Sequence, residues 1–362
     1  MGISMKSVAL ILLSLICWSV SADQSAKKAN GVVESPKNTK AIPLHVESPV
    51  YPRRAERRGI EGWVNVGFNI KADGTTDNIE VLGSSIEEYF DDAAVEATQA
   101  RTYKPATRNG KPVMEGNRTA RYTFIMNNSS GGVSNTFLTI YKKASDAIEN
   151  QDLELAKNLI DELDANRKRR LAEVCYLDML KANYFDKKGD DQATLRHVER
   201  ALMIANDVAS KDIYINLLKQ GIVDNGKANN FHTSLAHYNT LLEVDDKLPP
   251  NDPIHKFASR LEQILKSDSN IPTTGTIEHP CRACEAPDVY FWWHDLNRNR
   301  FLLDQVAGSL DKIEIVCESS SVSVVYQPET AWTVNKDGGD CSIRVIGDKN
   351  TTFRLIELAN NG

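Results

Sequence analysis

Residues 60–83 have the clearest alternation of apolar and polar positions in the chain. In the first half of this stretch every second residue is apolar: Val64, Val66, Phe68 and Ile70. A period of two is typical of a strand with one buried face. Gly74 can adopt the positive φ of a turn, and residues 78–82 return as a second alternating run. The pattern predicts a β-hairpin with one face in a core and the other in water.

A helix and a third strand are predicted after the hairpin. Ser85 and Glu88 have the spacing of a capping box, and apolar residues then recur at helical spacing before Pro105. The segment Arg118–Met126 alternates again, which predicts a strand. So small an α+β unit cannot cover both edges of its sheet, so we expect an edge strand with free backbone donors and acceptors. Such an edge can bind an extended peptide by strand addition.

Residues 136–268 change to a helical period. Polar breaks separate three predicted helical hairpins, and one leucine of each recurs at forty-position intervals: Leu155, Leu195 and Leu235. Regular hairpins predict a stacked repeat array that resembles tetratricopeptide repeats. A plain helical bundle fits the same pattern, and the sequence leaves both open. A stacked array would offer a second protein-binding surface.

Residues 281–362 contain short alternating segments that predict a small all-β domain, a sandwich or a barrel. The expected strands are 312–317, 321–326, 331–334, 342–346 and 352–358. The region also holds four cysteines: Cys281, Cys284, Cys317 and Cys341. We expect disulfides that brace the domain. A local Cys281–Cys284 pair and a Cys317–Cys341 clamp between strands fit the pattern, but three pairings are open.

Other ligand chemistry has weaker support in this region. Four side chains could supply zinc ligands: His279, Cys281, Cys284 and His294. Their irregular spacing and the expected oxidising compartment argue against a metal site. The tryptophans could stack on a sugar, although core packing is the commoner role: Trp292, Trp293 and Trp332. No known catalytic or phosphate-binding motif is found in the sequence, so we expect no enzyme activity, no cofactor and no metal.

The beginning of the chain predicts export. Residues 1–22 have a lysine, a short apolar run and small residues before Asp23, which is the layout of a signal peptide; a retained membrane anchor is the alternative. Residues 23–47 predict a disordered lead-in, and 127–135 and 269–280 predict linkers. The formal net charge of -6 and the pI near 5.7 argue against nucleic acid and anionic lipid as partners.

Residues 48–126 resemble the carboxy-terminal domain of TonB proteins. The positions that carry the resemblance span the predicted hairpin and its flanks: Tyr51, Pro52, Arg54, Ala55, Gly59, Glu61, Gly62, Val64, Val66, Phe68, Asp73, Gly74, Tyr103, Pro105 and Gly110. The resemblance implies a periplasmic β-β-α-β domain that binds a short peptide, the TonB box, of a TonB-dependent outer-membrane transporter. It implies binding by β-strand addition to the last strand, with inner-membrane proton-driven motor proteins as further partners.

The same resemblance assigns peptide-binding roles to two segments. The receiving strand would comprise Arg118, Thr119, Ala120, Arg121, Tyr122, Thr123 and Phe124. An amino-terminal arm that contacts the transporter would include Pro49, Tyr51, Pro52 and Arg54.

Residues 1–47 depart from the energy transducers of this family, which have a firm amino-terminal membrane helix and a long Pro-rich spacer. Here the apolar run is short and the lead-in contains only Pro36 and Pro43. We therefore expect a multidomain α+β protein of the periplasm, with a TonB-like domain, a helical hairpin array and a disulfide-braced all-β domain. Its expected function is peptide binding in TonB-dependent transport. The alternative is a periplasmic helical-repeat scaffold or adaptor without energy transduction.

Overall fold

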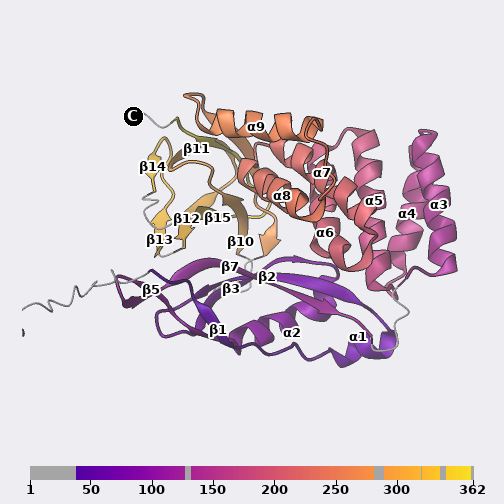
Figure 1. Ribbon diagram of the computed structural model, residues 1–362, viewed down its shortest axis with the longest axis horizontal. Helices are drawn as coiled ribbons and strands as arrows, with labels where there is room; N and C mark the ends of the chain where they lie inside the picture. The colour runs from indigo at the N-terminus through magenta and orange to yellow at the C-terminus, as the bar shows by residue number, and fades with distance from the viewer. Residues whose placement is uncertain (1–37, 127–131, 281–288, 319, 335–339, 360–362) are drawn as a thin grey trace, which may run out of the picture.

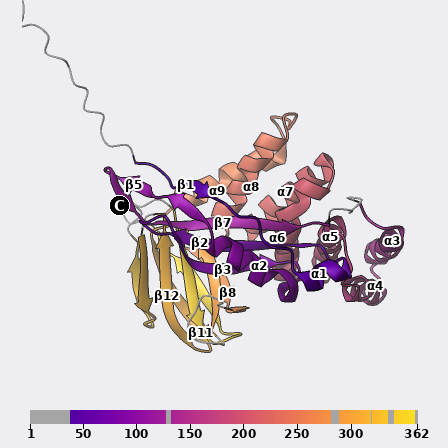
Figure 2. The same ribbon diagram turned by 90° about the horizontal axis from the view of Figure 1, so that it is seen from below.

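The computed structural model describes residues 38–126, 132–280, 289–318, 320–334 and 340–359. They form an α+β part, a helical array and a β-sandwich that contact one another (Figure 1). Seen from below, the small sheet of the α+β part lies across both the array and the sandwich (Figure 2). The predicted signal peptide, Cys281 and Cys284 lie outside the described residues. No helix in the described ranges is long and apolar enough to cross a bilayer.

A three-stranded antiparallel sheet forms the centre of the α+β part, in the order β3–β2–β7. Its strands are β2 (Gly62–Ile70), β3 (Thr76–Ser84) and β7 (Glu115–Phe124). Helix α2 (Glu87–Gln99) covers one face, where Phe90 stacks on Phe124 with ring centroids 4.4 Å apart. The four alternating apolar residues of β2 are buried on this face. The hairpin prediction is confirmed, and Gly74 has a φ of 87° in its turn.

Part of the predicted lead-in forms a strand, β1 (Ile42–His45), which pairs with β4 (Thr102–Lys104). The short hairpin of β5 (Ala106–Arg108) and β6 (Lys111–Val113) follows. All four residues of β1 are exposed, including Ile42 and Leu44, so backbone pairing and not a buried apolar face holds this strand. The alternation of Ile42 and Leu44 is too short to separate the strand from the polar lead-in around it.

The predicted capping box at the start of α2 is wrong, because Ile86 is the N-cap residue and no side chain caps it. The Ser85 hydroxyl instead accepts a hydrogen bond from the backbone N–H of Trp63, at 2.9 Å. A Cβ atom at Gly62 would lie 2.3 Å from this hydroxyl oxygen. The close approach of β2 to the loop before α2 therefore uses Ser85 and requires a glycine at position 62.

The helical array contains the helices predicted between residues 136 and 268. They are α3 (Asn135–Glu149), α4 (Leu153–Ala165), α5 (Leu171–Lys188), α6 (Asp191–Val208), α7 (Lys211–Lys227), α8 (Phe231–Val244) and α9 (Pro253–Leu265). Successive helices pack as antiparallel neighbours (Figure 1). Leu155 is 47% exposed whereas Leu235 packs in a core cluster, so the forty-position leucines are not equivalent. The resemblance to tetratricopeptide repeats stays a prediction.

Two antiparallel sheets form the β-sandwich, in the orders β13–β12–β15–β10–β9 and β14–β11–β16–β8. Their strands are β8 (Ile271–Thr276), β9 (His279–Pro280), β10 (Tyr290–Asp295), β11 (Arg300–Ala307), β12 (Leu310–Cys317), β13 (Ser320–Val325), β14 (Ala331–Thr333), β15 (Cys341–Gly347) and β16 (Thr352–Glu357). A Cys317–Cys341 disulfide joins β12 and β15, one of the pairings left open by the sequence. The all-β prediction is confirmed.

The segment 269–280, predicted as a linker, contains the edge strands β8 and β9. Pro272, Gly275 and three threonines give β8 little apolar character. Proline is tolerated at a sheet edge when its missing N–H would face away from the neighbouring strand. The composition that suggests a linker is therefore also compatible with an edge strand.

Candidate functional site

Strand β7 is an edge strand, and within the described ranges it pairs with β2 alone. The direction of its backbone groups follows from Trp63, whose carbonyl accepts from the N–H of Ser85 and so faces the β3 side. Because directions alternate along a strand, Val64 faces β7 and its register partner Tyr122 faces β2. The N–H and C=O groups of Thr119, Arg121 and Thr123 therefore point outward from the sheet.

The seven residues predicted to form the receiving strand all lie in β7. Ala120, Tyr122 and Phe124 are buried toward α2, whereas Thr119, Arg121 and Thr123 are exposed. Arg118 is half-buried and pairs with Glu115 at 3.1 Å. No backbone group of residues 118–124 bonds to any described element other than β2. The outer edge of this stretch has unused backbone hydrogen-bonding capacity.

The β-sandwich holds the beginning of β7. The N–H of Gly116 donates to the carbonyl of Glu318 at 3.0 Å. The Asn117 side chain donates to the Val316 carbonyl at 2.9 Å and accepts from the Ser342 hydroxyl at 2.7 Å. A Cβ atom at Gly116 would lie only 2.4 Å from the Cys317 carbonyl oxygen, so this contact requires glycine. The available edge therefore begins after Asn117.

The helical array holds the other end of β7. The Arg121 guanidinium donates to the Met203 carbonyl of α6 and pairs with Asp207 at 2.8 Å. Glu61, which is 2% exposed, accepts from two backbone N–H groups with its two carboxylate oxygens. One belongs to Met126 just after β7, at 2.9 Å, and the other to Leu171 at the start of α5, at 2.8 Å. Both ends of the edge strand are therefore fixed to other parts of the chain.

The amino-terminal arm meets β7 through Tyr51. The Tyr51 ring packs edge-to-face on Phe124, with centroids 5.8 Å apart, and its hydroxyl donates to the Ile60 carbonyl at 2.5 Å. Burial, with smaller contributions from nearby glutamates, raises the pKa of Tyr51 to about 12. Tyr51 is therefore a packing residue in the free protein, which places the arm beside the carboxyl end of β7.

The other arm residues lie at the start of helix α1 (Arg53–Arg58). Pro52 is the N-cap residue, and Pro49 is half-buried just before it. The exposed Arg54 guanidinium lies 5.2 Å from the centroid of the Tyr89 ring, a cation–π contact. The structure thus brings the arm and β7 together through Tyr51, while Arg54 extends toward α2.

The sheet face opposite α2 was predicted to be wet, and that prediction is wrong. Trp63 is 1% exposed in one core cluster with helical-array residues, and the Arg200 guanidinium lies 5.5 Å from its ring centroid. Arg344 of β15 is 2% exposed and bonds to Glu80 at 2.6 Å and to Asn78 at 2.9 Å. The cover combines one apolar insertion, Trp63, with polar contacts from Arg200 and Arg344, so the alternation of the hairpin gave little sign of it.

No three side chains of the metal-ligand types gather in the described part of the chain, and two of the four possible zinc ligands, Cys281 and Cys284, lie outside it. His294 is buried, with its Nε2 atom 3.1 Å from a Glu357 carboxylate oxygen. Cys175 is a buried free thiol, and burial raises its pKa to about 12. A neutral, buried thiol is a poor nucleophile.

Comparisons with known proteins concern the α+β part. Residues 47–125 match the family described as Gram-negative bacterial TonB protein C-terminal. Protein TonB of Pseudomonas aeruginosa is 44% identical over 71 residues, which are 20% of this chain and 21% of the relative. Protein TonB of Helicobacter pylori strain J99 is 42% identical over 53 residues, 15% of this chain and 19% of the relative.

A solved structure is also similar, the solution NMR structure of the Pseudomonas aeruginosa TonB CTD. It is 37% identical and covers 25% of this chain and 90% of that chain, with a TM-score of 0.23. This chain spans about a fifth of the length of the curated relatives it matches.

Proposed function

We propose that this chain, whose residues 47–125 form a TonB C-terminal domain, serves TonB-dependent outer-membrane transport by binding an extended peptide along β7. The family places such a domain in the cell envelope, and we propose the periplasm as its site of action. The observation that carries the proposal is the outward-facing backbone of Thr119, Arg121 and Thr123, which has no partner among the described elements. An added strand would satisfy these groups.

The proposed ligand is the TonB box peptide of an outer-membrane transporter. Its main chain would bond to β7. Its side chains would point alternately to the two faces of the sheet, toward Thr119 and Thr123 on one face and toward the arm near Tyr51 on the other. Recognition through backbone groups needs no catalytic residue, so we propose a binding protein and not an enzyme. If the chain transmits force directly, inner-membrane motor proteins would be its second partners.

A titration of the purified chain with amino-terminal peptides of TonB-dependent transporters tests the proposal. In Thr119→Pro the outward N–H is lost while the bonds to β2 remain, so we expect at least about tenfold weaker binding by calorimetry. Thr119→Val retains the N–H and the β-branched shape, so it should bind like the unchanged chain. Equal binding by Thr119→Pro and Thr119→Val, with both variants folded by circular dichroism, would contradict strand addition at β7.

A second candidate function is a periplasmic scaffold or adaptor without energy transduction. The contacts that favour it are those of Gly116 and Glu61, which attach the two ends of β7 to the sandwich and to α5. A domain fixed in this way could serve as a structural support for the helical array. Absence of binding to every transporter peptide tested, by a chain with a normal thermal transition, would favour this function.

A further inference from the structure

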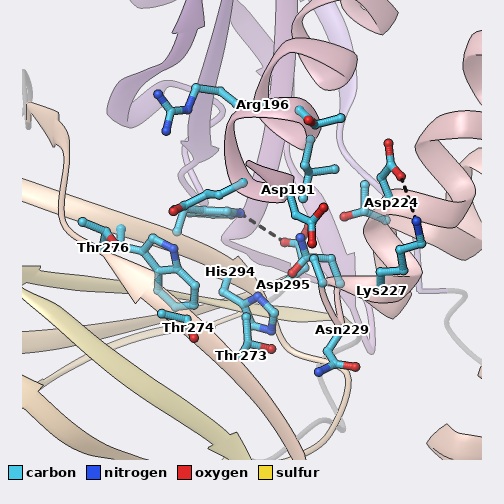
Figure 3. Close-up of a pocket in the computed structure, with 18 of the residues that line it drawn as sticks. Asp191, Arg196, Asp224, Lys227, Asn229, Thr273, Thr274, Thr276, His294 and Asp295 are labelled. Atoms are coloured by element: carbon cyan, nitrogen blue, oxygen red, sulfur yellow. Dashed lines mark hydrogen bonds and ion pairs between the residues drawn. The ribbon is translucent and has the colours of Figure 1, made fainter. Parts of the chain in front are cut away.

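A cleft of about 590 Å³ lies between the helical array and the β-sandwich (Figure 3). Strands β8 and β10, from different sheets of the sandwich, form one wall, and the ends of α5 and α7 with the starts of α6 and α8 form the other. In Figure 3, Thr273, Thr274 and Thr276 lie across from Asp191 and Asp224. The volume falls within the range of about 300–1,000 Å³ that is usual for ligand sites. The α+β part does not contribute to this cleft.

The open edge of β8 lines the cleft. Among the described strands, β8 is the outermost of its sheet and pairs only with β16. The Pro272 carbonyl accepts from the Asn229 side chain at 2.7 Å and so faces away from β16. The Ile277 N–H bonds to the Thr351 carbonyl and so faces the opposite way. Because backbone directions alternate along a strand, both observations place the N–H and C=O groups of Thr274 and Thr276 on the side away from β16, where they point into the cleft.

These four backbone groups have no hydrogen-bond partner in the described ranges of the chain. A sheet edge exposed in this way is a template for another strand. The Asn229 contact at Pro272 closes one end of the edge, and the Arg196–Glu278 ion pair, at 3.8 Å, spans the other end. The space between them therefore suits a short extended segment.

The cleft as a whole carries an excess of negative charge, with five carboxylates against two permanently charged cations, Arg196 and Lys227. Three of the carboxylates lie on the helical wall opposite β8, and the other two lie on the sandwich side: Asp186, Asp191 and Asp224, then Glu278 and Asp295. Lys227 is 3.9 Å from Asp224, whereas Asp191 makes no ion pair with a described residue. Burial raises the pKa of Asp224, and the neighbouring carboxylates Asp186 and Asp191 add to this, although Lys227 opposes it. A cationic group would relieve this repulsion.

We propose that the cleft binds an extended peptide segment, which adds to β8 as a further strand and directs a lysine or arginine side chain toward Asp191 and Asp224. Backbone pairing with Thr274 and Thr276 would supply the affinity, and the carboxylates of the opposite wall would select a basic residue. This site is separate from β7 and does not depend on the function proposed for the α+β part.

Fluorescence anisotropy of the purified chain in low-salt buffer tests the proposal with labelled heptapeptides. The first probe alternates threonine and valine around a central lysine, and its twin has glutamate at the centre. We expect the lysine probe to bind at least about tenfold more tightly than the glutamate probe, with the difference reduced by added salt. Replacing both carboxylates, in Asp191→Asn with Asp224→Asn, should bring the ratio of the two affinities close to one.

Variants of β8 test the strand addition itself. Thr274→Pro removes an N–H that faces the cleft and leaves the pairing with β16 intact, so we expect it to abolish binding of the lysine probe. Thr274→Val is the matched control and should bind normally. Slower amide hydrogen exchange at Thr274 and Thr276 on addition of the probe would locate the contact.

Three results would overturn the proposal. The first is absence of binding by either probe to a folded chain. The second is binding that Thr119→Pro weakens and Thr274→Pro does not, since this assigns the probe to β7. The third is binding of a neutral sugar such as chitotriose in the cleft without binding of peptide, which would assign the site, with its tryptophans Trp292 and Trp293, to carbohydrate.

Discussion

The Tyr51 phenol shows how one side chain can link a binding arm to the core. Its ring packs on Phe90 and Phe124, and its hydroxyl bonds to the Ile60 carbonyl. Family resemblance assigns Tyr51 to transporter contact, a role that stays a prediction. In the free protein the residue holds the arm against the end of β7, so substitutions there will affect stability as well as binding.

The raised pKa of Tyr51 predicts a loss of stability at alkaline pH. Burial, then Glu61 and Glu56, raises the pKa from 10.0 to about 12, so folding favours the neutral phenol. Its contribution to the free energy of unfolding is therefore complete below pH 10 and lost as the pH approaches about 12. We expect the urea midpoint of Tyr51→Phe to fall less over this window than that of the unchanged chain. If the urea midpoints of the two proteins fall in parallel as the pH rises, Tyr51 is not the group responsible for the loss of stability.

Buried residues of the hairpin were predictable from the sequence, but their hydrogen-bond partners were not. Alternation alone identified the inward face of β2, because burial of apolar side chains has a fixed period in a strand. The role of Ser85 depends on how closely β2 passes the loop before α2, which is a tertiary property. The polar contacts of Glu61 with Met126 and Leu171 also join distant segments and leave no local pattern.

Among the elements, sequence analysis missed β1 and β8, and also β10 and β11, which carry the buried Phe291 and Phe301. In β12 and β15 alternate apolar residues pack in the core of the sandwich, and both strands were predicted nearly to their ends. In contrast, β1 is fully exposed and β8 contains proline and glycine. Such strands are held by backbone pairing to segments far away in the sequence, so their formation depends on a neighbour that periodicity cannot detect.

The Cys317–Cys341 disulfide should stabilise both the sandwich and its contact with β7. It closes a loop with a sequence separation of 24, for which chain entropy gives about 3.5 kcal/mol. We expect Cys317→Ala with Cys341→Ala to lower the free energy of urea unfolding by roughly that amount. Because Gly116 bonds to Glu318 beside this disulfide, its amide should also exchange faster. An unchanged urea midpoint would show that strand pairing alone holds this end of the sheet.

In the whole molecule, the three parts are joined by buried contacts and not only by the chain. Trp63 inserts from the α+β part into the core of the helical array, and Arg344 of the sandwich reaches Glu80 and Asn78 of β3. Composition predicted three parts separated by linkers but could not predict that they pack together. The surfaces through which the parts contact one another combine one large aromatic ring with buried polar groups. In the sequence, such a mixture has the same composition as a solvent-exposed surface.

Removal of the Trp63 ring should uncouple the α+β part from the helices. Trp63→Ala leaves a cavity among the residues around α5 and α6, and such changes cost about 3–5 kcal/mol. We expect the thermal unfolding of the α+β part to separate from that of the array in differential scanning calorimetry. Trp332→Ala is a suitable control, because Trp332 lies in β14 of the sandwich. A single shared transition in Trp63→Ala would show that the remaining contacts are enough for cooperativity.

The anchoring of β7 at Gly116 and Glu61 has a mechanical consequence. If a captured segment is pulled along the direction of the strand, its main-chain bonds are stretched together in shear and not opened one at a time. The tension then spreads through Glu61 into α5 and through Gly116 into the disulfide-linked strands. A force applied along β7 would thus be distributed over the α+β part, the helical array and the sandwich.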